Sequence, residues 1–236
     1  MASSTTKSAY LRGARDGSPF VLVVSPFALL FGVVATEAGL NVAETLSFSV
    51  LVIAGASQFA ALQLMVEDAP TLIIVATALA VNLRMAMYSA SLTPHLGATP
   101  LWKRAVMAYF LVDQSYAVSI GEYEARPGMS LPEKVSYFFG VVTPVFPMWY
   151  AMTLVGALVG AQIPPEFALD FAVPITFLAL MAPAIRTAAH LAAALVSVTA
   201  ALTLAFLPYN LGLLLAALLA MATGAQVELM LERAAK

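Results

Sequence analysis

Two charged side chains, Arg84 and Asp113, lie well inside long apolar stretches of the sequence. A lone charge at the centre of a membrane helix costs about 2.5 to 3.5 kcal/mol on insertion scales, so both are expected to face the protein interior. Arginine is permanently charged and suits a substrate carboxylate, whereas an aspartate can accept a proton or a cation. The pattern predicts binding of a zwitterionic or anionic substrate. The alternative is that the two charges pair with each other, or with backbone carbonyls, and lock two helices together.

Helical spacing indicates which neighbours accompany these charges. Tyr88 follows Arg84 by four residues and shares its face, whereas Asn82 precedes Arg84 by two and points away. Tyr116 follows Asp113 by three residues and shares its face in the same way. We assign substrate binding to Asn82, Arg84 and Tyr88, and coupling to Asp113, Gln114 and Tyr116.

The stretch 54–64, Ala-Gly-Ala-Ser-Gln-Phe-Ala-Ala-Leu-Gln-Leu, places small residues and two carboxamides inside an apolar segment. Small residues let another backbone approach closely, and a buried Gln needs hydrogen-bond partners that hydrocarbon cannot supply. One interpretation is a locally unwound element whose free backbone groups bind substrate. The other is close helix packing, with Gln58 bonding between helices. The first interpretation adds Gly55, Ala56, Ser57, Gln58 and Phe59 to the substrate-binding residues.

The composition indicates an all-α polytopic membrane protein. Hydrophobic residues make up 61% of the 236 residues and charged residues only 10%, and the mean hydropathy is +0.91. A soluble domain of this size could not bury so much apolar surface. Runs of about 20 apolar residues suit helices rather than the alternating strands of a barrel. There is no cysteine, and the two histidines are far apart in the sequence, so we expect neither a metal site nor a cofactor.

Eight apolar segments succeed one another along the chain. They cover residues 19–36, 45–65, 71–92, 101–120, 135–160, 167–185, 187–206 and 210–227. We place residues 1–18 in the cytoplasm because they are polar and basic, assign 19–227 to one transmembrane domain, and interpret 228–236 as a short cytoplasmic tail. Residues 121–133 are expected to form a loop. The prolines expected to kink or break their segments are Pro144, Pro147, Pro174 and Pro183.

The charges of the connecting loops conflict with eight simple spans. Such a count places the acidic Glu67 and Asp68 inside and the basic Lys103 and Arg104 outside, against the positive-inside tendency. If the second and sixth segments enter the membrane and return to the same face, the basic residues fall inside. Six full spans and two re-entrant or broken segments would then form an inverted repeat, a pattern common in transporters. Both topologies stay open.

Several motifs occur in an order that resembles the AzlC-type branched-chain amino-acid exporters. They are Pro26-Phe-Ala-Leu-Leu-Phe-Gly32, Ala54-Gly-Ala-Ser-Gln-Phe59, Asn82-Leu-Arg84 with Tyr88, and Asp113. The resemblance implies proton-linked export of leucine, isoleucine, valine and often methionine across the bacterial cytoplasmic membrane. It also implies a small membrane partner of the AzlD type.

Two positions depart from the family pattern. Met85 replaces a frequent histidine and Gln114 replaces a frequent glutamate, so Asp113 is the main candidate for carrying a proton. An enzyme is not expected, because the sequence lacks the His-Glu-x-x-His and Gly-x-Ser-x-Gly motifs and a second aspartate to pair with Asp113. A passive channel, a permease for another small zwitterionic or apolar solute, or a scaffold for a transporting partner are the alternatives.

Overall fold

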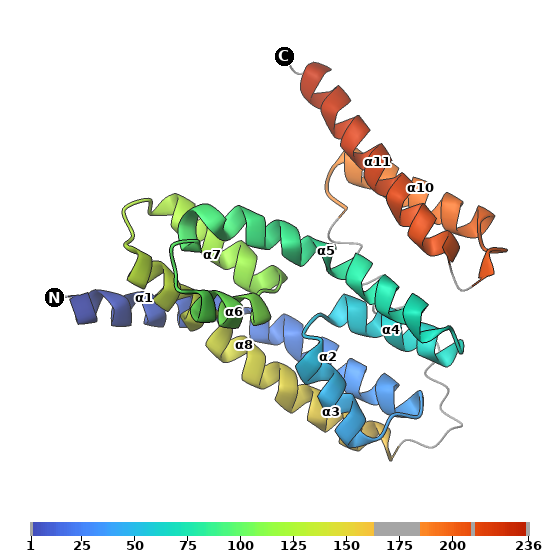
Figure 1. Ribbon diagram of the computed structural model, residues 1–236, viewed down its shortest axis with the longest axis horizontal. Coiled ribbons are helices and arrows are strands. Elements are labelled where there is room, and N and C mark those ends of the chain that lie inside the picture. Colours follow the sequence, from blue (N-terminus) through green and yellow to red (C-terminus); the bar gives the residue numbers. More distant parts are fainter. Residues whose placement is uncertain (1, 163–184, 209–210, 235–236) are drawn as a thin grey trace. The chain divides into compact units, whose positions relative to one another are not determined.

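The computed structural model describes residues 2–162, 185–208 and 211–234, and in these ranges every regular element is a helix (Figure 1). The expected all-α class is therefore confirmed. The helices are α1 (Ala2–Gly17), α2 (Phe20–Glu37), α3 (Val42–Leu51), α4 (Gly55–Val66), α5 (Thr71–Leu96), α6 (Leu101–Tyr109), α7 (Asp113–Ala125), α8 (Leu131–Gly160), α10 (Ala188–Thr203) and α11 (Leu211–Ala234). Among the described helices, α2, α5, α8 and α11 are long and apolar enough to cross a membrane. This agrees with a polytopic membrane protein.

The chain divides into two compact units. The first comprises Met1–Leu62 and Ala78–Phe167, and the second comprises Gln63–Thr77 and Ala168–Lys236. In the second unit, α10 and α11 pack against each other along their lengths (Figure 1). Arg84, Asp113 and their neighbours all belong to the first unit, so that unit carries the site.

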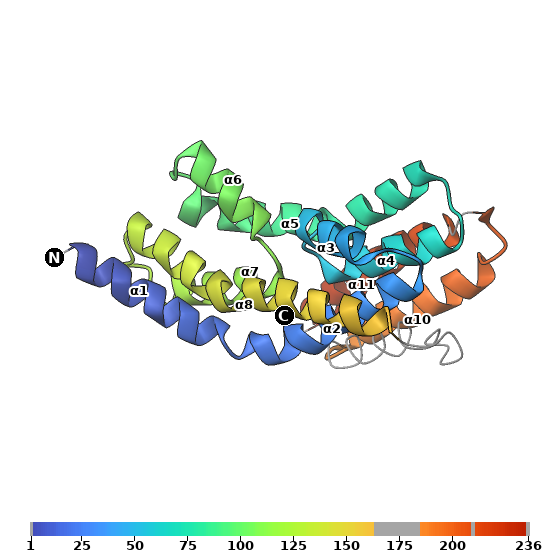
Figure 2. The same ribbon diagram turned by 90° about the horizontal axis from the view of Figure 1, so that it is seen from below.

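The long helix α8 organises the first unit, because α1 packs along its first half and α2 along its second half (Figures 1 and 2). Glycines allow both close approaches. A Cβ atom at Gly13 would collide with the carbonyl oxygen of Tyr137, and one at Gly156 would collide with that of Leu29. Small residues at such contacts bring helix backbones together in membrane proteins. Helices α1 and α2, which follow one another in sequence, are thereby both packed closely against α8.

The polar N-terminal residues form a helix that the sequence analysis missed. Helix α1 lies against α8, where Tyr137 Oη donates a hydrogen bond of 2.8 Å to Asp16 and Ser136 Oγ donates one of 2.8 Å to the carbonyl oxygen of Thr6. The low hydropathy of residues 1–18 gave no sign of this helix, because its contact with α8 depends on glycines and hydrogen bonds more than on an apolar face.

Helix α3 attaches to α8 through a buried polar contact. Trp149 Nε1 donates a hydrogen bond of 2.8 Å to Ser49 Oγ, which lies 3.1 Å from the hydroxyl of Thr153. Ser49 and Thr153 are fully buried. Because unpaired polar groups are costly in such surroundings, this contact fixes the register of α3 on α8.

Two apolar segments expected to be continuous are broken. The segment 45–65 is interrupted at residues 52–54, between α3 and α4, and the segment 101–120 is interrupted at residues 110–112, between α6 and α7. The expectation of a continuous helix over 101–120 was wrong, because side-chain contacts described below replace the missing helical hydrogen bonds. The first interruption agrees with the alternative of a broken second segment. Broken helices of this kind surround binding sites in many transporters.

Several predicted boundaries also need correction. Helix α5 continues through Pro94 to Leu96, and residues 121–125, expected in a loop, complete α7. Helix α8 is not broken at Pro144 or Pro147, since its packing on α1 and α2 supports the turns on either side of them. Helix α11 extends beyond residue 227 to Ala234. The predicted segment 167–185, with Pro174 and Pro183, lies outside the described residues except at its last position.

Candidate functional site

The two charges that lie within apolar stretches of the sequence form an ion pair. Arg84 Nη1 lies 3.1 Å from Asp113 Oδ2, and Tyr88 Oη donates a hydrogen bond of 2.9 Å to Asp113 Oδ1. The rings of Tyr88 and Tyr116 are stacked with centroids 4.2 Å apart, and the Tyr116 hydroxyl lies 3.0 Å from that of Ser91. We call these five residues the polar cluster. Both oxygens of the carboxylate are thus bonded by side chains of α5.

The local fold explains why α5 and α7 meet in this way. Arg84, Tyr88 and Ser91 follow one another at helical spacing on α5 and form one stripe. Asp113 is the first residue of α7, where the unpaired N–H groups of a helix favour a negative charge. Ser115 stabilises the interruption before it, because its Oγ accepts a hydrogen bond of 2.8 Å from the Val112 N–H and contacts the Phe110 carbonyl.

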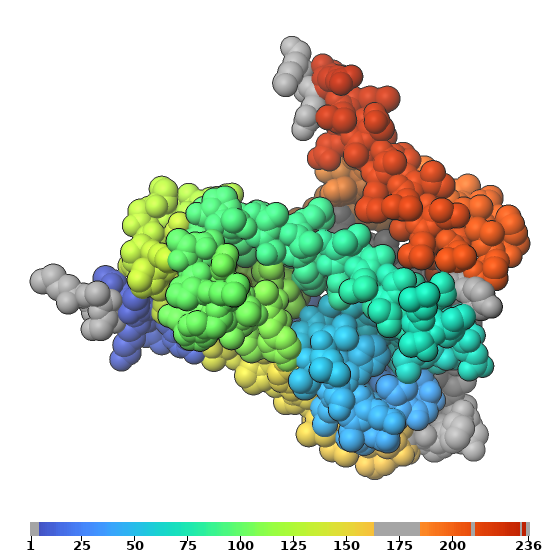
Figure 3. Space-filling view, viewed as in Figure 1, coloured from blue at the N-terminus to red at the C-terminus, as the bar shows by residue number. Residues whose placement is uncertain are grey.

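The ion pair is only partly covered by the described residues. The side chains of Arg84 and Asp113 are 30% and 44% exposed. None of the residues in the most apolar window of α5 is buried, and the part of α5 in the first unit lies at the surface beside α6 (Figure 3). The cluster is therefore open to a ligand on one side, while the Arg84 Nε atom on its inner side is buried without a hydrogen-bond partner in the described chain.

Four of the residues assigned from the sequence come together as helical spacing predicts, namely Arg84, Tyr88, Asp113 and Tyr116. The pairing of the two charges, weighed as an alternative, is what the structure contains. Their roles in binding and coupling stay predictions. Asn82 and Gln114 form no hydrogen bond to the cluster in the described chain, and the Oδ1 atom of Asn82 is buried without a partner.

The stretch from Gly55 to Phe59 is the first turn of α4, and the interruption lies just before it. Gly55 is required by packing, because a Cβ atom there would collide with the ring of Phe27. Phe59 stacks edge-to-face on the same ring at 5.0 Å, and Ser57 Oγ donates a hydrogen bond to the Ala54 carbonyl.

Gln58 in the same turn is fully buried, and its amide oxygen and nitrogen have no partner among the described residues. The predicted hydrogen bond between helices is therefore not present there. Of Ala56 the structure shows only that it is partly buried. Gly55, Ser57 and Gln58 make no hydrogen bond or ion pair with Arg84 or Asp113 in the described residues, so the stretch and the polar cluster are not joined directly.

The two interruptions are connected by a residue that the sequence analysis did not identify. Tyr109 Oη, at the end of α6, donates a hydrogen bond of 2.8 Å to the carbonyl oxygen of Val50 near the end of α3. That carbonyl belongs to the last turn of α3, whose acceptors have no helical partner. The Tyr109 hydroxyl also lies 3.0 Å from that of Tyr150 on α8.

Ser91 and Ser115 were missed as well. The spacing of seven residues from Arg84 to Ser91 could have identified Ser91, whereas no sequence signal marks the contact of Tyr109 with Val50. In the part of the chain that the structure describes, no three His, Cys, Asp or Glu side chains are placed to hold a metal ion. The cluster offers instead one cation, one anion and three hydroxyl groups, with the stacked tyrosine rings as an aromatic wall.

Comparison with known proteins identifies relatives of this chain. The family model described as "AzlC protein" matches residues 19–163. Among curated proteins, the chain is 27% identical over 149 residues to "Inner membrane protein YgaZ" of Escherichia coli, covering 63% of this chain and 60% of that protein. It is 30% identical over 156 residues to an "Uncharacterized membrane protein" of Archaeoglobus fulgidus, covering 66% and 65%, and 28% identical over 153 residues to one of Helicobacter pylori, covering 63% and 65%.

The chain therefore spans less than two thirds of the length of these relatives. No solved structure matches it significantly. The matched region includes both helix interruptions and the whole polar cluster, and ends just after α8.

Proposed function

Because the chain belongs to the AzlC family of membrane proteins, we propose that it exports branched-chain amino acids across the bacterial cytoplasmic membrane. Leucine, isoleucine and valine are the expected substrates, and methionine is a further candidate. Membership of this family indicates a role in membrane transport rather than in catalysis. The observation that carries the finer proposal is the half-exposed pair of Arg84 and Asp113 between apolar helices.

An internal ion pair is chemically complementary to a zwitterion. The carboxylate of an amino acid takes the place of Asp113 at the Arg84 guanidinium, and its ammonium group binds the Asp113 carboxylate. One ion pair is exchanged for two, and the net charge of the site stays at zero. In this proposal, the ion pair with its Arg84–Asp113 distance of 3.1 Å represents the state without substrate.

Proton coupling follows from competition for Asp113. A proton on this carboxylate removes the negative charge that holds the substrate ammonium, so substrate and proton exclude each other at one group. The more acidic side of the membrane then favours release of the amino acid, and an inward proton gradient drives export. Tyr88 keeps the carboxylate oriented in both states through its bond to Oδ1.

The aliphatic side chain of the substrate needs an apolar surface beside the ion pair. The stacked rings of Tyr88 and Tyr116 supply one wall. We include the turn from Gly55 to Phe59 in the binding region, because the Gln58 amide is buried without a partner and gains one when a substrate carboxylate or ammonium reaches it. We also keep Asn82 and Gln114 among the proposed binding and coupling residues. The Oδ1 atom of Asn82 has no partner in the described chain, and both side chains carry amide groups that can bind substrate.

We propose a small membrane subunit of the AzlD type as partner. The proposal is inherited from the family resemblance, and the uncovered face of α5 offers a place for such a subunit beside the half-exposed ion pair.

The test is efflux of labelled leucine, valine and methionine from proteoliposomes that contain this chain alone or with the small subunit, with and without an imposed pH gradient. Saturable efflux that an acidic exterior accelerates supports the proposal. Absence of leucine flux under every condition overturns it. Flux that does not saturate and is accompanied by single-channel conductance indicates a passive channel instead.

A further inference from the structure

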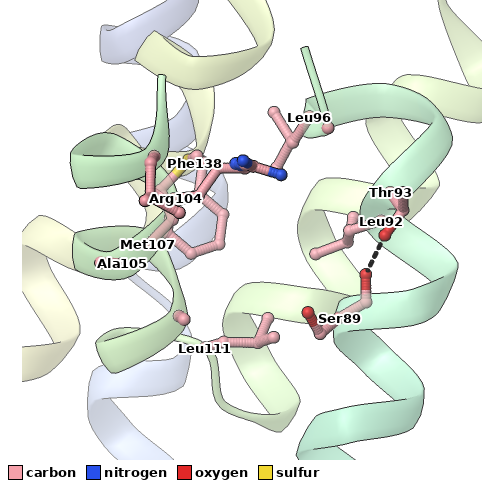
Figure 4. A pocket seen from close by; sticks show the side chains of 12 residues that line it. Ser89, Leu92, Thr93, Leu96, Arg104, Ala105, Met107, Leu111 and Phe138 are labelled. Carbon is pink, nitrogen blue, oxygen red and sulfur yellow. Dashed lines mark hydrogen bonds between the residues drawn. The ribbon is translucent and has the colours of Figure 1, made fainter. Parts of the chain in front are cut away.

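A cavity lies between α5 and α6, and none of the polar-cluster residues lines it (Figure 4). Its volume is about 310 Å³, and its walls are mostly apolar, with Leu92 and Leu96 from α5 and Met107 and Leu111 from the other side. This is near the lower end of the range for ligand sites, roughly 300 to 1,000 Å³. A single molecule of amino-acid size fits such a cavity, whereas a peptide or a whole phospholipid does not.

The cavity carries an exposed cation, Arg104, that has no ion-pair partner among the described residues. Arg104 lines it and lies beside Leu96 at one end, while Ser89 and Leu111 face each other at the opposite end (Figure 4). In the described chain the Arg104 guanidinium makes no ion pair or hydrogen bond, and the Ser89 hydroxyl donates none. One positive end, an apolar body and a hydroxyl at the far end are complementary to a small aliphatic carboxylate.

The end of the cavity at Ser89 and Leu111 lies close in sequence to residues of the polar cluster. Ser89 follows Tyr88 in α5, and Leu111 belongs to the interruption whose next helix begins with Asp113. Arg104 lies near the start of α6, next to Trp102 and Lys103, a combination typical of the membrane interface. The cavity therefore extends from Arg104 at one end to positions close in sequence to the polar cluster at the other.

We propose that this cavity is a first binding site for the transported amino acid, in which Arg104 holds the carboxylate and the leucine-rich wall holds the aliphatic side chain. This inference rests on the transport function proposed above. It assigns Arg104 to initial recognition, whereas Arg84 and Asp113 take the substrate during translocation.

The first test compares Arg104→Gln with Lys103→Gln. Both remove one positive charge from α6, but Lys103 lies over the ring of Trp102, 5.3 Å from its centre, and does not line the cavity. We expect Arg104→Gln to raise the KM of leucine efflux about tenfold while the maximal rate changes less than twofold, because one charge-assisted contact is lost before translocation. Lys103→Gln should leave KM within twofold of the parent. Equal KM values for the two variants overturn the assignment.

Binding of labelled leucine to the detergent-solubilised chain separates this inference from the transport proposal, because it needs no flux. Unlabelled 4-methylpentanoate, which keeps the carboxylate, should compete for the Arg104-dependent binding, and leucinamide should not. A chain that binds leucine through Arg104 but supports no efflux refutes the transport proposal alone. Efflux without Arg104-dependent binding refutes the cavity alone.

A volume test checks that the cavity itself is occupied. Ala108 lines the cavity and Val106 does not. Ala108→Phe should weaken leucine binding at least tenfold, whereas Val106→Phe should not change it more than twofold. An anionic lipid is the other candidate occupant of the cavity. In that case Arg104→Gln will alter activity only in vesicles rich in phosphatidylglycerol, and competition of 4-methylpentanoate with leucine will not change. That result overturns the proposal.

Discussion

Replacement of Asp113 by Asn is the most informative perturbation of the polar cluster. An asparagine keeps the size of the side chain, and its oxygen can still accept the hydrogen bond from Tyr88, which is 2.9 Å long. It cannot bind a proton, and it carries no charge for Arg84 or for a substrate ammonium. The substitution therefore removes the proposed coupling group with little change of shape.

The size of the effect follows from the contacts. Hydrogen bonds to a charged group contribute about 1.5 to 3 kcal/mol when they are well formed. The Asp113 side chain is 44% exposed, so its contribution to substrate binding should lie near the lower limit, about 1.5 kcal/mol. Since 1.4 kcal/mol corresponds to a factor of ten, the KM for leucine should rise about tenfold, and efflux should no longer respond to an imposed pH gradient.

The assay is leucine efflux from proteoliposomes at several exterior pH values, with Asp16→Asn as the control. Asp16 also accepts a hydrogen bond from a tyrosine, but it lies on α1, outside the cluster. The control should keep the pH response of the parent chain. Efflux of Asp113→Asn that still follows the gradient would show that another group carries the proton. A lowered KM would show that the substrate carboxylate displaces Asp113 without its ammonium binding there, and would refute exchange.

Three further substitutions test the framework of the first unit. Gly156→Ala should destabilise the protein by about 1 to 3 kcal/mol in thermal melts, because the added Cβ atom would collide with the backbone of α2. The control, Gly121→Ala, should not change stability, because there is open space around Gly121. Ser49→Ala should cost about 1 to 3 kcal/mol in the same melts, because it leaves the buried Trp149 N–H unpaired. Tyr109→Phe removes the bond to the end of α3 and should slow efflux several-fold at unchanged stability; a wild-type rate would show that the two helix interruptions work independently.

Helical periodicity was sufficient to predict the centre of the site. Positions 84 and 88, and positions 113 and 116, share faces because an α-helix repeats every 3.6 residues. The cost of burying single charges predicted that Arg84 and Asp113 would face the protein interior. They pair with each other, as the alternative proposed, but their side chains stay 30% and 44% exposed in the described chain. The all-α class followed from hydropathy alone. These features depend on local spacing or on composition, and both can be read along one chain.

The interruption at residues 110–112 depends on side-chain contacts, and local sequence did not locate it. Residues 110–112 are Phe-Leu-Val, with no proline or glycine to mark an end. The interruption persists because Ser115 bonds to the backbone of its first and last residues, Phe110 and Val112, and because Tyr109 bonds to the backbone of α3. Helix α1 was missed for a related reason, since its packing on α8 requires Gly13 to meet the backbone of Tyr137, and Gly140 to meet that of Tyr10, far along the sequence.

Charge balance connects these elements into one explanation of substrate choice. A site made of one cation and one anion is neutral when empty and neutral when a zwitterion bridges it, so neither state places a net charge among apolar helices. A cationic or anionic analogue of leucine would leave one of the two charged side chains unpaired, which costs binding free energy. Burial of its small aliphatic group contributes about 0.8 kcal/mol per CH₂ and offsets this cost only in part. The interruption before Asp113 matters here, because a first-turn carboxylate can exchange partners without the loss of helical hydrogen bonds. The proposed exchange therefore predicts selectivity for zwitterions from the paired charges, and preference among aliphatic side chains from the walls around them.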